Sequence, residues 1–131
     1  MVKSAQLAAA VVLAVAVLWV GVDQVLIRVR SGGGFAGRYD LVVIWESGRV
    51  LVGEREPARS QLTPGQLRRL RAALDAADFA HSPHHRGGVN FGYSIDYGRW
   101  SVIVDSSDVA GAPWLADVLQ VPQEVTSDHR R

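Results

Sequence analysis

The chain has 131 residues, enough for one domain plus an appendage, and a formal net charge of +1 at pH 7. Residues 23–131 contain 13 arginines and 13 acidic residues, and this balance argues against a nucleic-acid-binding domain. The sequence has no cysteine, which excludes disulfides, thiolate metal sites and lipid attachment through cysteine.

Residues 5–22, AQLAAAVVLAVAVLWVGV, form an uncharged and mostly apolar run, here called the membrane segment. As a helix it would rise about 27 Å, close to the ~30 Å hydrocarbon core of a bilayer. A cleaved signal peptide is the alternative, because Ala14-Val15-Ala16 fits the small-x-small rule, but that site lies inside the apolar run. The sequence therefore predicts a transmembrane helix or signal anchor within residues 1–22.

The composition also bears on the location of the protein. Arginine almost replaces lysine, whose only example is Lys3, and this usage indicates a GC-rich bacterial genome. Counting Arg28 and Arg30 against Lys3 would place the following domain in the cytoplasm. A very short basic tail before an apolar run is instead typical of an export signal. We expect a single pass through the cytoplasmic membrane with the globular domain outside the cytoplasm.

Alternation of residue types predicts the first strands. The stretches VLIRVR (25–30) and RYDLVVIWE (38–46) are rich in β-branched and aromatic residues at period two. The turn ESGR (46–49) then leads to a return strand over 50–55, which is typical of a hairpin.

The pattern changes to helical spacing over residues 62–79, LTPGQLRRLRAALDAADF. Thr63 is a natural N-cap, Pro64 suits the first helical position, and Gln66 completes a capping box. The apolar stripe of this helix consists of Leu67, Leu70, Leu74 and Ala77.

A second hairpin follows, with strands over 90–98 and 100–105 joined by Gly98-Arg99, a two-residue connection of the type II′ kind. Residues 113–120, PWLADVLQ, predict a short amphipathic helix that begins at Pro113. Together these elements predict an α+β fold: a transmembrane helix, then a small antiparallel sheet of about five strands with one central helix and a short C-terminal helix. The globular domain would span 23–120, and 121–131 would be a polar, frayed tail.

The glycine-rich segment between the first two strands is the candidate partner-binding loop. Glycines allow another surface to approach the backbone closely, and an exposed aromatic residue is typical of an interface anchor. A flexible hairpin turn, with Phe35 folded onto the core, is the open alternative. The candidate residues are Ser31, Gly32, Gly33, Gly34, Phe35, Ala36 and Gly37.

The same segment contains a formal G-x-G-x-x-G at Gly32, Gly34 and Gly37. A dinucleotide site needs a helix after this motif, because the pyrophosphate rests on that helix's N-terminus. Here a strand pattern follows, so no nucleotide is expected.

Two further groups of residues have side chains that can take part in catalysis or metal binding. The motif formed by His81, His84 and His85 could share a metal, but no cysteine supports it and the H-E-x-x-H pattern is absent. Asp96 and Asp105 could act as an acid and base pair, although solvation beside a turn explains them more simply. We therefore expect no catalytic residues, no metal and no cofactor.

Residues 25–120 resemble the emfourins, small bacterial protein inhibitors of thermolysin-like zinc metallopeptidases that include a protealysin inhibitor. The resemblance lies in IRVRSGGGFAGRYD, LTPGQLRRLRAALDAADF, NFGYSIDYGRWSVIVD and PWLADVL, and is most specific in the loop from Ser31 to Gly37. It implies an inhibitor domain without catalysis, and the membrane segment predicts that this domain is anchored to the membrane. One additional glycine and the membrane segment depart from the family pattern. The alternative is an accessory or assembly subunit of a bacterial membrane protein complex.

Overall fold

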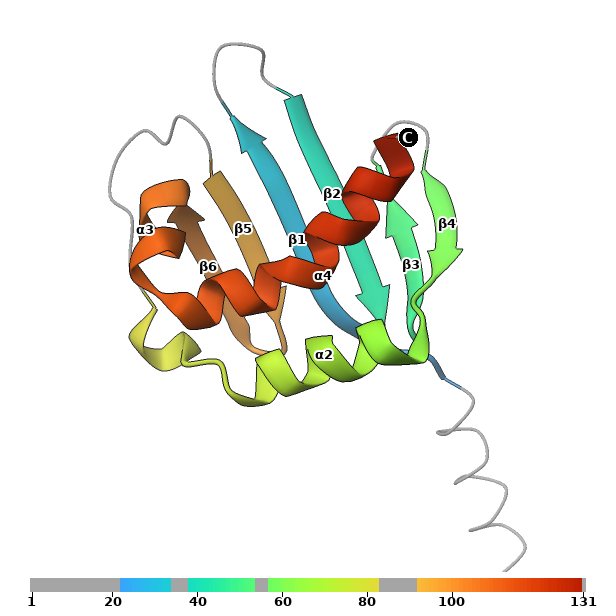
Figure 1. Cartoon of the computed structure of the whole chain (residues 1–131), viewed down its shortest axis with the longest axis horizontal. Helices are drawn as coiled ribbons and strands as arrows, with labels where there is room; N and C mark the ends of the chain where they lie inside the picture. The colour runs from blue at the N-terminus through green and yellow to red at the C-terminus, as the bar shows by residue number, and fades with distance from the viewer. Residues whose placement is uncertain (1–21, 34–37, 54–56, 83–91, 131) are drawn as a thin grey trace, which may run out of the picture.

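Six strands form one antiparallel sheet in the computed structural model, which describes residues 22–33, 38–53, 57–82 and 92–130 (Figure 1). Their order across the sheet is β4-β3-β2-β1-β5-β6, so β1 is hydrogen-bonded on both sides. The strands are β1 (Val25–Gly33), β2 (Arg38–Trp45), β3 (Arg49–Val52), β4 (Ala58–Gln61), β5 (Gly92–Tyr97) and β6 (Trp100–Asp105). The fold is α+β, as predicted.

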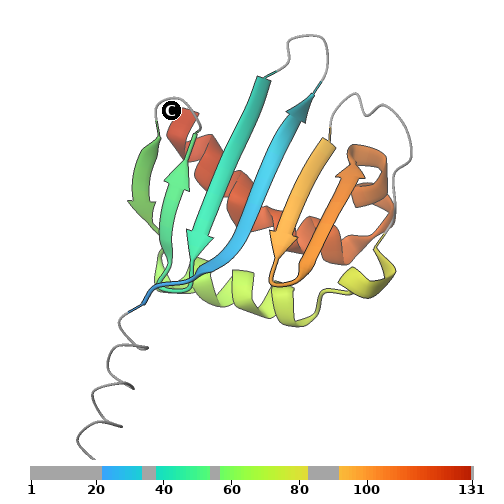
Figure 2. The same cartoon turned by 180° about the vertical axis from the view of Figure 1, so that it is seen from behind.

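The helices cover one face of the sheet. They are α2 (Pro64–Asp75), the 3₁₀ turn η1 (Phe79–His81), α3 (Ser106–Gly111) and α4 (Pro113–Arg130). Helices α2 and α4 pack across one face in Figure 1, and among the described residues the view from behind shows no helix over the other face (Figure 2). The core lies between these layers and includes Ile27, Val29, Val42, Ile44, Val50, Val52, Leu70, Leu74, Ile95, Val102, Val104, Leu115, Val118 and Leu119.

Helix α2 begins as the sequence predicts. The Thr63 hydroxyl accepts a hydrogen bond from the Gln66 amide at 3.1 Å, and the Gln66 side chain accepts one from the Thr63 amide at 2.9 Å. Pro64 occupies the first turn, where its missing N–H is not needed. Leu70 and Leu74 are buried, which confirms the face assigned to the core. The helix ends at Asp75, short of the predicted Phe79.

Both hairpins are confirmed, and the second closes in two residues. Tyr97 pairs with Trp100, and Gly98 has a φ of +55°. A left-handed φ at the first turn position is what a II′ connection requires, and only glycine adopts it without strain.

Three elements differ from the sequence prediction. Strand β4 is a sixth strand, and three of its four residues are exposed, so no alternation marked it. Helix α3 is six residues long with none buried. The helix expected over 113–120 is not short, because α4 continues to Arg130. The expected polar tail is therefore wrong for residues 121–130, which contribute Val121 and Val125 to the core.

Residues 1–21, which hold nearly all of the membrane segment, lie outside the described residues. In the part of the chain that is described, no helix combines the length and the apolar character needed to cross a bilayer.

The start of β1 is fixed to the β2–β3 turn by the side chain of Asp23. One carboxylate oxygen accepts from the Ser47 amide at 3.1 Å and the other from the Ser47 hydroxyl at 2.6 Å. The second oxygen also lies 3.6 Å from Nε of Arg49. The Glu46 amide donates to the Gln24 carbonyl at 2.8 Å. Residues 23 and 24 therefore belong to the rigid body of the sheet.

Candidate functional site

The structure places the first three candidate residues in a strand. Ser31, Gly32 and Gly33 are the last residues of β1 and pair with residues 40, 39 and 38 of β2. The expected loop is therefore shorter than the sequence suggested, because pairing extends three residues beyond the predicted strand end. Gly34, Phe35, Ala36 and Gly37 lie outside the described residues.

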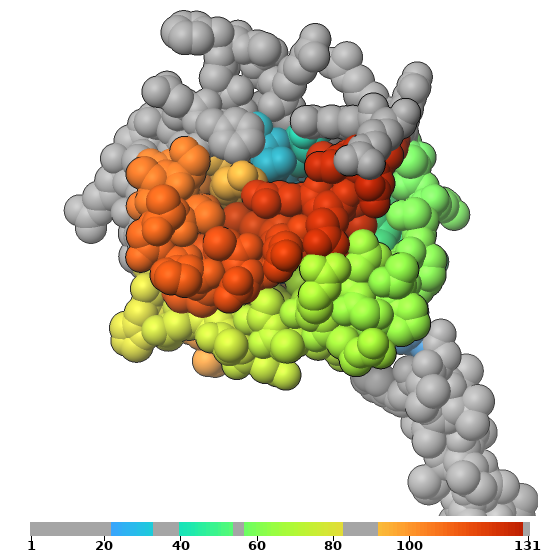
Figure 3. All heavy atoms as spheres, viewed as in Figure 1, coloured from blue at the N-terminus to red at the C-terminus, as the bar shows by residue number. Residues whose placement is uncertain are grey.

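A cleft opens beside this end of β1, between the sheet and α4. Its volume is about 280 Å³. In the space-filling view, atoms of β1 and β2 are visible next to α4 on the helix side of the molecule (Figure 3). This hairpin cleft is lined by Val29, Ser31, Asp40, Val42, Tyr93, Leu119, Pro122, Gln123, Thr126 and Ser127.

The register of the sheet explains why three polar residues gather on the floor of the hairpin cleft. Ser31 pairs with Asp40 on β2 and with Tyr93 on β5. Directly paired residues in an antiparallel sheet point to the same face, so a hydroxyl, a carboxylate and a phenol stand side by side. Helix α4 closes the cleft, and Nε2 of Gln123 donates to the Tyr93 hydroxyl at 3.1 Å.

The chemistry of the cleft suits binding. Its lining combines apolar side chains with hydroxyls, an amide and the carboxylate of Asp40. Such a mixture can hold a polar or basic segment of a peptide through hydrogen bonds and one charge.

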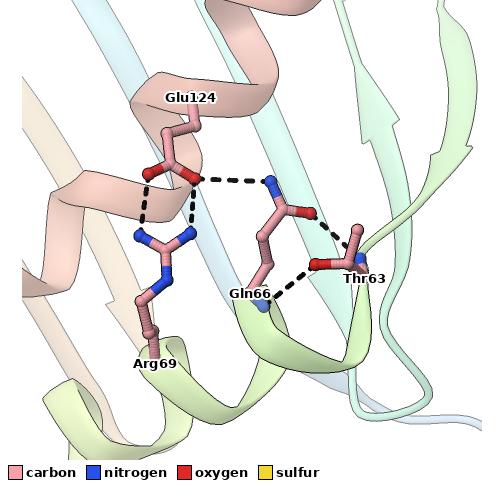
Figure 4. A network of polar contacts seen from close by, with 4 residues as sticks. All are labelled: Thr63, Gln66, Arg69 and Glu124. Atoms are coloured by element: carbon pink, nitrogen blue, oxygen red, sulfur yellow. Dashed lines mark hydrogen bonds and ion pairs between the residues drawn. The ribbon is translucent and has the colours of Figure 1, made fainter.

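Helix α4 is held in position by a polar network that begins at the α2 cap (Figure 4). Arg69 donates to both carboxylate oxygens of Glu124, at 2.8 and 2.9 Å. Gln66, which also completes the cap on Thr63, donates to Glu124 at 3.3 Å. The hydrogen bonds that Arg69 donates to Glu124 lower the pKa of Glu124, against the raising effect of partial burial. The same hydrogen bonds raise the pKa of Arg69.

The three histidines that could share a metal are not brought together by the described part of the structure. His81 lies in η1 with Nδ1 2.9 Å from Asp78, while His84 and His85 fall outside the described residues. Within the described ranges, no three His, Asp or Glu side chains cluster as metal ligands would.

Asp105 serves as the N-cap of α3. Its carboxylate accepts from the Asp108 amide at 2.8 Å, and the Asp108 carboxylate accepts from the Asp105 amide at 3.0 Å. This is a capping box, in which the carboxylates of Asp105 and Asp108 accept hydrogen bonds from backbone amides at the start of α3.

Sequence reasoning missed the part of the cleft that α4 supplies. Gln123, Thr126 and Ser127 follow Gln120, where the helix was expected to end. The spacing of Val118, Val121 and Val125 was the available signal, since it continues the helical period past Gln120.

Comparisons of the chain with protein-family models, with curated proteins and with solved structures find no match.

Proposed function

We propose that this chain is a non-catalytic protein-binding domain that contacts its partner with Ser31–Gly37 at the end of the β1–β2 hairpin. By its resemblance to the emfourins, the partner is a thermolysin-like zinc metallopeptidase, which the domain inhibits. In this proposal the membrane segment holds the protein in the bacterial cytoplasmic membrane with the domain outside the cytoplasm.

The pairing of Gly33 with Arg38 carries the proposal. It leaves only residues 34–37 to connect the two strands, and these include Phe35. The ends of the connection are held by the β1–β2 ladder, and β5 supports β1 from the other side as far as Gly32. The β1–β2 ladder therefore fixes where the connection leaves and re-enters the sheet, so a partner that contacts the connection would also lie next to the end of β1.

The hairpin cleft supports the proposal as a second contact area. It shares Ser31 with the candidate loop and continues along α4. A partner segment that passes the loop would meet the Asp40 carboxylate and the hydroxyls of Tyr93 and Thr126. One surface would thus combine an apolar contact with polar groups that fix orientation.

The test is inhibition of a thermolysin-like peptidase by the full-length chain in detergent. Phe35→Ala should leave the melting temperature nearly unchanged and weaken inhibition tenfold or more, since ~1.4 kcal/mol corresponds to a decade. Gly33→Val should also weaken inhibition while β1 still pairs, because a β-branched residue suits a strand but obstructs close approach. Ile103→Ala, an apolar truncation at an exposed position of β6, is the control.

Two results would contradict the proposal. A large fall in melting temperature with inhibition intact would assign Phe35 to the core. Unchanged peptidase activity, with stable co-purification in a membrane complex, would favour the accessory or assembly subunit.

A further inference from the structure

The face of the sheet opposite the helices carries an apolar strip. Of the described residues, no helix packs there, and the strands are seen directly from this side in Figure 2. Residues on β2 and β3 that alternate with the core positions form the strip: Leu41, Val43, Trp45 and Leu51. A shallow hollow of about 270 Å³ lies against Trp45 and Leu51. This surface is called the open face below.

Four arginines flank the strip. Along one row of the register, Arg28 pairs with Val43, Val43 with Leu51, and Leu51 with Arg59. Arg30 lies one row further along β1, and Arg49 lies over the Trp45 ring at 4.4 Å. Two acidic residues lie on the described strands of this face: Asp96, which pairs with Arg28, and Asp105, at the end of β6 where α3 starts. The open face is therefore apolar in the middle and positively charged around it.

Two of these charges are available to a ligand. Arg28 and Arg59 are exposed, and their side chains form no hydrogen bond or ion pair with the described residues of the chain. In a domain without net charge, such a one-sided distribution creates a local positive potential.

The chain enters β1 at one end of the open face, beside Trp45. Val22, the last residue of the membrane segment, is 61% exposed, and Val25, 45% exposed, pairs with Trp45. Since Asp23 fixes the start of β1 to Ser47, at most a residue or two separates the membrane segment from the rigid sheet. A bilayer that holds residues 5–22 would therefore lie next to the open face.

We propose that the open face binds the anionic headgroups of the bilayer, with Arg28, Arg30, Arg49 and Arg59 contacting phosphates and Trp45 at the interfacial level. This inference rests on the membrane segment of the proposed function. Arginine matches phosphate oxygens in geometry and charge, and tryptophan favours the membrane interface.

Other occupants fit the open face less well. A second copy docked by two-fold symmetry would bring this positively charged face against an identical positively charged face. The membrane segment, folded back, is uncharged and would leave the arginines without partners. An acidic protein would match the charge, but the position of Val22 and Val25 does not favour it over lipid.

The experiment uses the full chain in vesicles. Because the chain has no cysteine, Ile103→Cys on the open face and Gln120→Cys on α4 can each carry one fluorescent label. Vesicles contain phosphatidylcholine alone or mixed equally with phosphatidylglycerol, with a spin-labelled headgroup as quencher. We expect several-fold stronger quenching at position 103 than at 120, only with phosphatidylglycerol, and loss of the difference at high salt.

Variants assign the effect to the arginines. The double change Arg28→Gln and Arg59→Gln should abolish the difference between the two labels. The double change Arg68→Gln and Arg99→Gln alters net charge equally but lies off the open face, and should leave the difference intact. Circular dichroism checks that both variants are folded.

Each result that would contradict the inference points to a different explanation. Equal quenching at both positions would overturn the inference, and so would quenching at position 103 that does not depend on lipid charge or salt concentration. A response of the label at position 103 to soluble polyglutamate but not to phosphatidylglycerol would assign the open face to an acidic protein. Cross-linking at position 103 that does not require lipid would assign the open face to a second copy of the chain. Extraction of the chain by alkaline carbonate would show that the membrane segment itself fails, and the inference with it.

Discussion

Arg69 of α2 and Glu124 of α4 form a two-bond ion pair across 55 residues of sequence, with N–O distances of 2.8 and 2.9 Å. Both side chains are partly exposed, so salt screens the pair and its contribution to stability is small. The pair nevertheless fixes α4 against α2 beside the hairpin cleft.

The Arg69–Glu124 pair predicts a pH dependence. The hydrogen bond from Arg69 holds the folded-state pKa of Glu124 below its ordinary value of 4.5. The stabilisation is therefore complete above pH 4.5 and is lost as the pH falls through the lower folded value. Glu124→Gln should lower the melting temperature slightly at neutral pH and flatten its decline below pH 4.5. Asp128→Asn, an exposed change on α4, is the control, and parallel curves for wild type and Glu124→Gln would contradict the prediction.

Leu70 and Leu74 connect α2 to the core and are 0% and 5% exposed. Replacing either with alanine should lower the free energy of unfolding by about 2–5 kcal/mol, because the loss of buried surface adds to the cost of a cavity. Denaturant unfolding followed by fluorescence measures this. Arg68→Ala, on the exposed side of the same helix, should change stability little, and an equally small effect of Leu70→Ala would contradict the packing.

The last turns of α4 should be essential for stability. Val121 and Val125 are 2% and 8% exposed, and burying one such side chain contributes about 1.5–3 kcal/mol. Val125→Ala should therefore destabilise clearly, and a stop codon after Gln120 should prevent stable folding. Asp128→Ala is the exposed control. A truncated chain with an unchanged melting temperature would restore the interpretation of a dispensable tail.

Because Asp105 is the N-cap of α3, removing its carboxylate should lower the stability of the fold. Asp105→Ala removes the acceptor for the Asp108 amide and should cost about 0.5–2 kcal/mol. Asp105→Asn, which retains an acceptor oxygen, should recover most of this loss. Thermal unfolding of both variants measures the difference, and an unchanged melting temperature in Asp105→Ala would contradict the capping role.

Local signals in the sequence predicted much of the fold. Alternation marked β1, β2, β5 and β6 because one side of each strand packs on the core. Thr63, Pro64 and Gln66 marked the start of α2 because a helix N-terminus needs acceptors for its free amides. These features depend on neighbouring residues alone.

The missed features depend on tertiary contacts. Strand β4 forms because β3 offers a free edge, and its sequence ARSQ has little β-propensity of its own. Pro122 discourages a helix, yet it is almost fully buried where α4 packs on the sheet. The hairpin cleft could not be predicted either, because Ser31 and Tyr93 meet only through the pairing of β1 with β5.

Strand β1 also has a mechanical consequence. It begins two residues after Asp23 and ends at Gly33, within the candidate loop. Tension between a tethered N-terminus and a partner held at the loop would run along this strand. This tension would act on the eight paired positions with β2 and the five with β5 at the same time, so their hydrogen bonds would have to break together. Pulling between these two points should require more force than pulling on β6, an outer strand that can be peeled away one pair at a time.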